Sequence, residues 1–208
     1  QALEQYTDVI IRQTGDLRRI VDEFSKFARM PEPERRQADL LKLLRDAVVL
    51  QENVLEHVAL SLSCEHNQIW AYIDQTMISQ ALINLIKNAG EAIESRMEKN
   101  PSDDYRPQIR IAVAIDSDTG ETEVTIADNG TGLPENRARL FEPYVTTREK
   151  GTGLGLSIVK KIIEEHGGTL ELLDAPPFDG ADHVGAMARI VLPVTALTKP
   201  KGAKQHVA

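Results

Sequence analysis

The chain has 208 residues, of which 41% are hydrophobic and 27% charged, and its formal net charge is −8. This composition allows one packed domain with a small appendage. The negative charge argues against general nucleic-acid binding, which needs a basic surface. The single cysteine, Cys64, excludes an intrachain disulfide. No apolar run in the sequence approaches the roughly 18 residues that span a bilayer, so we expect no membrane contact by these residues.

Residues 1–29 carry a heptad-like stripe whose members alternate spacings of three and four. The stripe consists of Leu3, Tyr6, Ile10, Gln13, Leu17, Ile20, Phe24 and Phe27. Such spacing places these side chains on one seam of a helix, which should pair with a helix outside this chain or in a second copy. The alternative is that the seam packs on the domain that follows.

Met30-Pro31-Glu32-Pro33 should end this helix, because proline cannot continue it. We therefore divide the chain into four parts. They are a helix over residues 1–30, a linker over 31–38, a folded domain over 39–194 and a basic tail, expected to be disordered, over 195–208.

Within the domain, three helices and six strands are predicted. Asp39 and Asp74 should cap the first two helices, because an aspartate before an apolar stripe accepts from free backbone N–H groups. The helices cover 39–51, 75–97 and 154–166, and the strands cover 57–63, 68–73, 109–115, 123–127, 170–173 and 188–192. The first two strands are expected to form a hairpin. Strands that arrive in adjacent pairs predict an α/β (α+β) two-layer sandwich, with a mixed sheet and helices on one face.

The second predicted helix carries Asn84 and Asn88 on the face opposite its apolar stripe. A solvated polar surface would explain them. However, asparagine is a mediocre helix former, and its amide oxygen suits a Mg²⁺ ion that is held mainly by phosphates and water. We therefore predict a cofactor-binding role for both residues, with Asn88 as the metal ligand.

Two glycine-rich turns follow. Asp128-Asn129-Gly130-Thr131-Gly132 comes directly after a strand. It could be a simple hairpin turn, but Gly130 and Gly132 would also let the backbone approach a flat ligand, and the Asp128 carboxylate could accept from the exocyclic amine of a base.

The second turn is preceded by an irregular lid over 133–150 and leads into a helix. Free N–H groups at a helix start favour phosphate. Lys150 at its mouth is either a phosphate ligand or a solvated cation. The predicted binding residues here are Lys150, Gly151, Thr152, Gly153, Leu154 and Gly155.

In order, the chain shows Asn-x-x-x-Asn-Ala, Asp-x-Gly-x-Gly, Phe141-Glu142-Pro143-Tyr144 and Gly-Thr-Gly-Leu-Gly-Leu. This combination resembles the catalytic ATP-binding domain of sensor histidine kinases, over residues 35–195. The sequence around Asn88 and Phe141 is most similar to that of the nitrogen-regulatory NtrY/NtrB branch.

The resemblance implies a Bergerat (GHKL-type) ATP-binding fold with ATP and Mg²⁺ as ligands. Asn88 would bind the Mg²⁺ and Asn84 would lie beside it. Asp128 would recognise the adenine amino group, and Phe141 would anchor the start of the lid. Residues 1–29 would be the second helix of a dimerisation and phosphotransfer hairpin. Expected partners are a response-regulator receiver domain and the dimerisation helices of a second copy, in the cytoplasm, with a parent that is compatible with an inner-membrane sensor.

One departure from the family pattern limits the expected activity. The histidines are His57, His66, His166, His183 and His206, and none has the sequence context of a phosphoacceptor. A protein-histidine kinase fragment that lacks its acceptor is therefore expected. An ATP-hydrolysing relative of the gyrase, Hsp90 or MutL type is the alternative, although such enzymes carry an acid where this chain has Asn84. A third possibility is an interaction module with a vestigial pocket.

Overall fold

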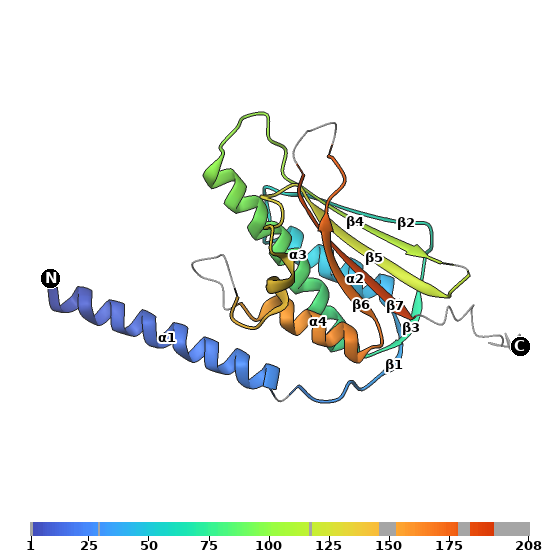
Figure 1. Ribbon diagram of the computed structural model, residues 1–208, viewed down its shortest axis with the longest axis horizontal. Helices are drawn as coiled ribbons and strands as arrows, with labels where there is room; N and C mark the ends of the chain where they lie inside the picture. The colour runs from blue at the N-terminus through green and yellow to red at the C-terminus, as the bar shows by residue number, and fades with distance from the viewer. Residues whose placement is uncertain (1, 29, 117, 146–152, 179–183, 194–208) are drawn as a thin grey trace, which may run out of the picture.

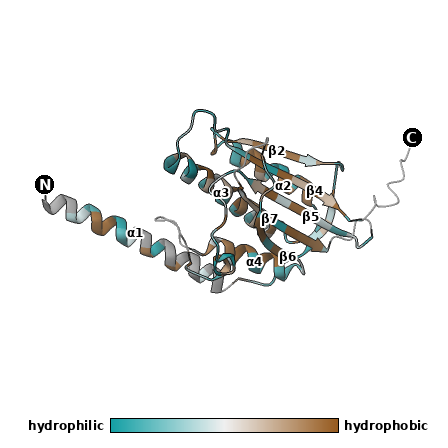
Figure 2. Ribbon diagram, turned by 45° about the horizontal axis from the view of Figure 1, so that its top comes forward, coloured by the Kyte–Doolittle hydropathy of each residue, from teal (hydrophilic) through white to brown (hydrophobic). Residues whose placement is uncertain are grey.

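The computed structural model describes residues 2–28, 30–116, 118–145, 153–178 and 184–193. Three helices cover one face of a five-stranded sheet: α2 (Leu40–Glu52), α3 (Gln75–Lys99) and α4 (Gly155–Glu165) (Figure 1). Their apolar faces meet the sheet in one hydrophobic core. Figure 2 colours long parts of β5, β7 and α4 brown, in keeping with this core. The predicted two-layer α/β sandwich is confirmed.

The strand order in the main sheet is β2-β4-β5-β7-β6. The strands are β2 (Ala59–Cys64), β4 (Gln108–Ile115), β5 (Glu121–Asp128), β6 (Thr169–Asp174) and β7 (Ala186–Pro193). Only β2 and β4 pair in parallel, and the three other pairs are antiparallel. The sheet is therefore mixed, as the sequence predicts.

The predicted hairpin between the first two strands is wrong. β2 pairs with β4, whereas β3 (Trp70–Ile73) pairs antiparallel with β1 (Arg36–Asp39) in a separate two-stranded sheet. Alternating hydrophobicity indicates a strand but not its partner. Residues 36–38 fall in the predicted linker but belong to β1. The sequence of this strand, Arg-Gln-Ala-Asp, has Ala38 as its single apolar residue, so it shows no alternating pattern.

Both predicted aspartate caps are present. Asp39 Oδ1 accepts from the N–H groups of Leu41 and Lys42, and it also accepts from Ile69 at 3.1 Å. Asp74 Oδ1 accepts from Thr76 and Met77. Each cap is expected to stabilise its helix by about 1 kcal/mol.

The end of α4 is joined to the start of α3. Gly167, with φ of 75°, closes α4 by donating its N–H to Glu164 O. The preceding His166 is buried; its Nδ1 lies 2.7 Å from Ile162 O, and its Nε2 accepts from the N–H of Asp74 at 3.0 Å. The two helices therefore run antiparallel, with the start of α4 beside the middle of α3.

The N-terminal residues form α1 (Ala2–Ala28), in agreement with the predicted helix. Within the seam, Tyr6, Ile10 and Leu17 are 68%, 64% and 62% exposed. These side chains are therefore uncovered in this structure. No helix in the described part of the chain is both long and apolar enough to cross a membrane.

Candidate functional site

The site is built along α3. The apolar stripe of this helix, from Ile78 to Ile93, is buried against the sheet. Asn84 and Asn88 lie off that stripe and are half-buried, one turn apart. Both predicted residues therefore lie on the side of α3 that faces away from the core, where their amide groups can meet a ligand.

Asp128 ends β5 and is only 4% exposed. Its Oδ1 accepts from the Gly130 N–H at 2.8 Å. Burial raises the pKa of the Asp128 carboxyl to about 6, and backbone hydrogen bonds from Gly130 and Ala186 lower it in part. A buried carboxylate held by only backbone donors has remaining acceptor capacity for a ligand.

Gly130 and Gly132 allow the turn after β5 to pack closely. A Cβ on Gly130 would lie 2.6 Å from the backbone of Ala92 in α3. Gly132 has φ of 77°, and a Cβ there would meet Val184 O at 2.8 Å. The N–H of Thr131 donates to Ala92 O at 3.2 Å. The turn is thus pressed against α3 one turn beyond Asn88.

Two residues that position Asp128 were not predicted. Gly185 faces the end of β5 so closely that a Cβ would lie 1.8 Å from Asp128 O. Asn129 is buried and accepts at Oδ1 from the N–H of Gln108 at 2.9 Å. The backbone oxygen of Asn129 accepts from Arg96 at 2.7 Å, and Tyr105 donates to Asn129 as well. No sequence signal distinguishes these roles, because they arise from contacts between distant segments.

The second glycine turn opens α4. Gly153 has φ of 68°, and a Cβ on it would lie 2.6 Å from the backbone of Tyr144. Leu154 is fully buried, and its carbonyl accepts from Ser157 Oγ. A Cβ on Gly155 would meet nothing within 4 Å. The N-terminus of α4 therefore has open space at Gly155, next to the tightly packed turn at Gly153. Such a helix N-terminus suits an anion. Lys150, Gly151 and Thr152 lie outside the described residues.

The start of the lid is fixed to the domain. Residues Arg137–Phe141 form a short 3-10 helix, η1. Arg137 pairs with both carboxylate oxygens of Asp174, at 2.6 and 2.7 Å. Phe141 packs against the core, and Lys160 Nζ lies 5.0 Å from its ring centre. Phe141 has the position that an anchor of the lid requires, and Arg137 ties the same short helix to the end of β6 at Asp174.

No group of three or more histidine, cysteine or acidic residues with metal-site geometry occurs in the described part of the chain. A divalent cation at this site would therefore depend on neutral amide oxygens such as that of Asn88, together with phosphate oxygens and water. Those are ligands that Mg²⁺ prefers, so the residues fit such an ion.

The chain matches known proteins in sequence and structure. Residues 73–196 match the model of the histidine kinase-, DNA gyrase B-, and HSP90-like ATPase family. The chain is 49% identical over 183 residues to the nitrogen regulation protein NtrY of Azorhizobium caulinodans, which covers 87% of this chain and 23% of the relative.

Two solved structures support the same relationship. The catalytic domain of histidine kinase ThkA is 29% identical, with a TM-score of 0.62 over 77% of this chain and 96% of its own. Full-length ShkA in complex with AMPPNP has a TM-score of 0.70 at 24% identity, over 96% of this chain and 41% of its own, and shows the shared fold.

The chain spans about a quarter of the length of the curated relatives that it matches. The match to the family model nevertheless includes α3, the two glycine turns and α4. The chain therefore belongs to the histidine kinase-, DNA gyrase B- and HSP90-like ATPase family, and within it to the ATP-binding catalytic domains of sensor histidine kinases.

Proposed function

We propose that this chain binds ATP with Mg²⁺ and presents the γ-phosphoryl group to a histidine on a helix outside the chain. In the parent protein, the phosphoryl group then passes to an aspartate of a response-regulator receiver domain. The arrangement along α3 carries this proposal. The turn that holds Asp128 packs on Ala92, and Asn88 and Asn84 follow at successive helical turns.

The base would bind where Asp128 ends β5. Its carboxylate would accept a hydrogen bond from the adenine amino group, which gives specificity for adenine over a base with a carbonyl at that position. Gly130 and Gly132 would let the backbone lie against the ring. Asn129 and Gly185 would fix the direction of the carboxylate, because Asn129 Oδ1 accepts from the Gln108 N–H at the start of β4 and Gly185 packs against Asp128 O.

The phosphates would lie between Asn88 and the start of α4. The free N–H groups from Gly153 to Gly155 and the positive end of the helix dipole would favour the negative charge. Lys150, Gly151 and Thr152 would add contacts from the lid. Asn88 would hold Mg²⁺, which neutralises phosphate charge and orients the γ-phosphoryl group, with Asn84 beside it.

The chemistry is then a transfer between two bound groups. A ring nitrogen of the acceptor imidazole forms a bond to the γ-phosphorus, the bond from that phosphorus to the bridging oxygen breaks, and ADP leaves with the electron pair. The imidazole proton passes to solvent. This chain supplies position and charge stabilisation, which is most of what phosphoryl transfer requires.

Hydrolysis of ATP is the competing function. It requires a base to activate water, and Asn84 stands one turn before Asn88, where hydrolysing relatives carry an acid. An amide cannot accept the proton of water at neutral pH, so transfer is favoured over hydrolysis.

We also propose that α1 pairs with helices of its own dimer in the cytoplasm, because its seam is exposed.

The test supplies the upstream helix with its acceptor histidine and follows label from γ-labelled ATP. Labelling of that histidine is expected, and Asn88→Asp should reduce it by at least tenfold. Rapid ATP hydrolysis by the unmodified chain in the absence of the acceptor would contradict the proposal. Calorimetry with a non-hydrolysable ATP analogue, with and without Mg²⁺, would separate a binding defect from a transfer defect.

A further inference from the structure

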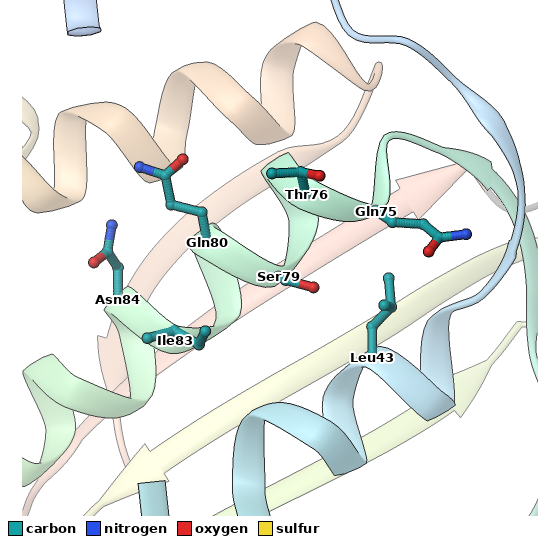
Figure 3. A pocket seen from close by; sticks show the side chains of 7 residues that line it. All are labelled: Leu43, Gln75, Thr76, Ser79, Gln80, Ile83 and Asn84. Atoms are coloured by element: carbon teal, nitrogen blue, oxygen red, sulfur yellow. The ribbon is translucent and has the colours of Figure 1, made fainter. Parts of the chain in front are cut away.

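A single ridge of α3 carries the candidate site, and it continues beyond the residues already placed there. Figure 3 shows Asn84 on the side of α3 that faces α4. Asn88 and Ala92 follow at intervals of four residues, and Ala92 O accepts from the N–H of Thr131 in the turn after β5. Residues four apart are neighbours on the surface of a helix. Arg96 is the next member of this ridge, one turn beyond Ala92.

Arg96 and Tyr105 together contact Asn129, the residue that follows Asp128. Arg96 Nη1 donates to Asn129 O at 2.7 Å, and Arg96 Cζ lies 4.3 Å from the ring centre of Tyr105, within cation–π range. The Tyr105 hydroxyl lies 3.0 Å from both Asn129 O and Asn129 Oδ1 and shares its proton between them. Burial raises the pKa of Tyr105 to about 12, with Arg96 lowering it in part and Asp128 raising it. The hydroxyl is therefore protonated and able to donate at neutral pH.

All four polar atoms of Asn129 are engaged. In addition to the contacts with Arg96 and Tyr105, its N–H donates to Gln108 O at 3.3 Å and its Oδ1 accepts from the Gln108 N–H at 2.9 Å. Its Nδ2 donates to Arg106 O at 2.7 Å. Asn129 is only 7% exposed, so these hydrogen bonds are shielded from water and strengthened by their surroundings. Asn129 is thus fixed from α3, from the segment before β4 and from β4 itself.

The direction of the Asp128 carboxylate depends on how its own backbone is held. Hydrogen bonds weaken steeply when the donor, hydrogen and acceptor depart from a line, so a small rotation of the Asp128–Asn129 peptide would misdirect the carboxylate. Gly185 packs against Asp128 O. Arg96 and Tyr105 hold Asn129 O, which is the next carbonyl along the chain. These two side chains are therefore placed to determine where the carboxylate points.

We propose that Arg96 and Tyr105 are positioning residues for adenine recognition, an inference that rests on the proposed function. They act through Asn129 and aim the Asp128 carboxylate at the exocyclic amino group of the base. They thereby set the preference for adenine over a purine that lacks this amine. The competing explanation is that the cluster only closes the connection between α3 and β4. A purely structural cluster would affect stability and would weaken the binding of every nucleotide equally.

The first test removes one hydroxyl group. Tyr105→Phe keeps the ring beside Arg96 and loses only the hydrogen bonds to Asn129. Its affinity is measured by calorimetry, with Mg²⁺, for ADP and for purine riboside diphosphate, which differ only in the exocyclic amino group. The Kd for ADP should rise by about three- to tenfold, and the Kd for purine riboside diphosphate should change by less than about twofold. An equal rise in both Kd values would overturn the proposal.

Arg96→Met is the second variant, because it keeps an unbranched side chain of similar length while removing the donor and the charge. It should also lower the preference for ADP over purine riboside diphosphate by about three- to tenfold. Tyr72→Phe is the matched control, since Tyr72 is 70% exposed on β3, outside the main sheet. It should leave both Kd values unchanged. Urea denaturation of each variant measures any change in stability separately from the change in preference.

A double-mutant cycle shows whether the effect passes through Asp128. In an Asp128→Asn background, Tyr105→Phe should change the Kd for ADP by less than about twofold. Losses that simply multiply would place the effect of Tyr105 elsewhere and overturn the proposal. In labelling of a supplied acceptor hairpin, Tyr105→Phe should raise the KM for ATP and leave kcat unchanged. A lower kcat with an unchanged KM would equally contradict a role in positioning the base.

The unmodified chain separates this inference from the proposed function. It should bind ADP more tightly than purine riboside diphosphate. Absence of ADP binding would contradict the proposed ATP site, and equal affinities for the two nucleotides would contradict the proposed adenine contact, so the inference would fall with either. A preference for ADP that survives in both Tyr105→Phe and Arg96→Met would overturn the positioning role alone.

Discussion

The N–H of Asp74 donates a 3.0 Å hydrogen bond to Nε2 of the buried His166 and ties the start of α3 to the end of α4. The other ring nitrogen, Nδ1, lies 2.7 Å from Ile162 O and must carry the proton that this carbonyl accepts. Asp74 also accepts at Oδ2 from the Glu34 N–H at 2.9 Å. One residue therefore connects both helices of the candidate site with the segment that leads from α1.

The first prediction concerns this connection. His166→Ala should lower the free energy of unfolding by about 1–3 kcal/mol, because it leaves the N–H of Asp74 without its acceptor and removes buried side-chain volume. Urea denaturation of the two proteins measures the difference. His57→Ala is the control, since His57 is exposed, and should change stability by less than about 0.5 kcal/mol. Equal stabilities of the His166 variant and the unmodified chain would show that the hydrogen bond is unimportant.

The second prediction separates two kinds of glycine. Gly185→Ala should destabilise the fold strongly, by at least about 2 kcal/mol, because its Cβ would lie 1.8 Å from Asp128 O. Gly155→Ala should leave stability unchanged or slightly higher, because its Cβ meets nothing within 4 Å and alanine favours the helix.

If Gly155 meets the phosphates, Gly155→Ala should nevertheless weaken binding of an ATP analogue several-fold, since its Cβ would project into the space they need. Thermal unfolding and calorimetry of both variants test the distinction. A stable Gly185→Ala protein would show that the turn after β5 can shift, and full affinity in Gly155→Ala would remove that residue from the site.

Local signals in the sequence predict much of this structure. Asp39 and Asp74 each precede an apolar stripe, and both act as helix caps. Asn84 and Asn88 fall on the outward side of α3 because a helical period fixes the direction of each side chain. The partners of β2 and β3 could not be predicted, because alternation leaves the pairing open.

Non-local contacts account for what the sequence does not reveal. The start of α3 and the end of α4 are far apart in sequence, and no local pattern indicates a partner for His166. The structure adds its hydrogen bond with Asp74. Gly185 looks like an ordinary loop glycine until the fold brings it against Asp128.

The third prediction is that Asp128 lowers stability at neutral pH. Burial raises its pKa from 3.8 to about 6, so between those values the folded protein holds more protons at this group than the unfolded chain. Its contribution is therefore fully favourable below about pH 4, declines as the pH rises to about 6, and leaves a cost on the order of 3 kcal/mol above that.

Asp128→Asn removes this charge and should be more stable than the unmodified chain at pH 7.5. The difference should shrink as the pH falls to 4, which urea titrations at several pH values can follow. Comparison within the pair is essential, because carboxyls such as Asp74 and Asp116 have lowered pKa values and act in the opposite direction. A constant difference across this range would contradict burial of an ionisable Asp128.

The last prediction concerns binding by the same residue. If the ionised Asp128 accepts from the adenine amino group, its loss as a charged acceptor in Asp128→Asn should cost about 1.5–3 kcal/mol, which corresponds to roughly 10- to 100-fold in the Kd of an ATP analogue. In the unmodified chain, protonation of Asp128 below about pH 6 should weaken binding progressively. The Kd of Asp128→Asn should lack this pH dependence, because asparagine does not titrate. The ratio of the two Kd values, measured from pH 7.5 to 5, cancels the titration of the nucleotide phosphates. A ratio that falls toward one at low pH supports adenine recognition by Asp128, and a ratio near one at every pH would exclude it.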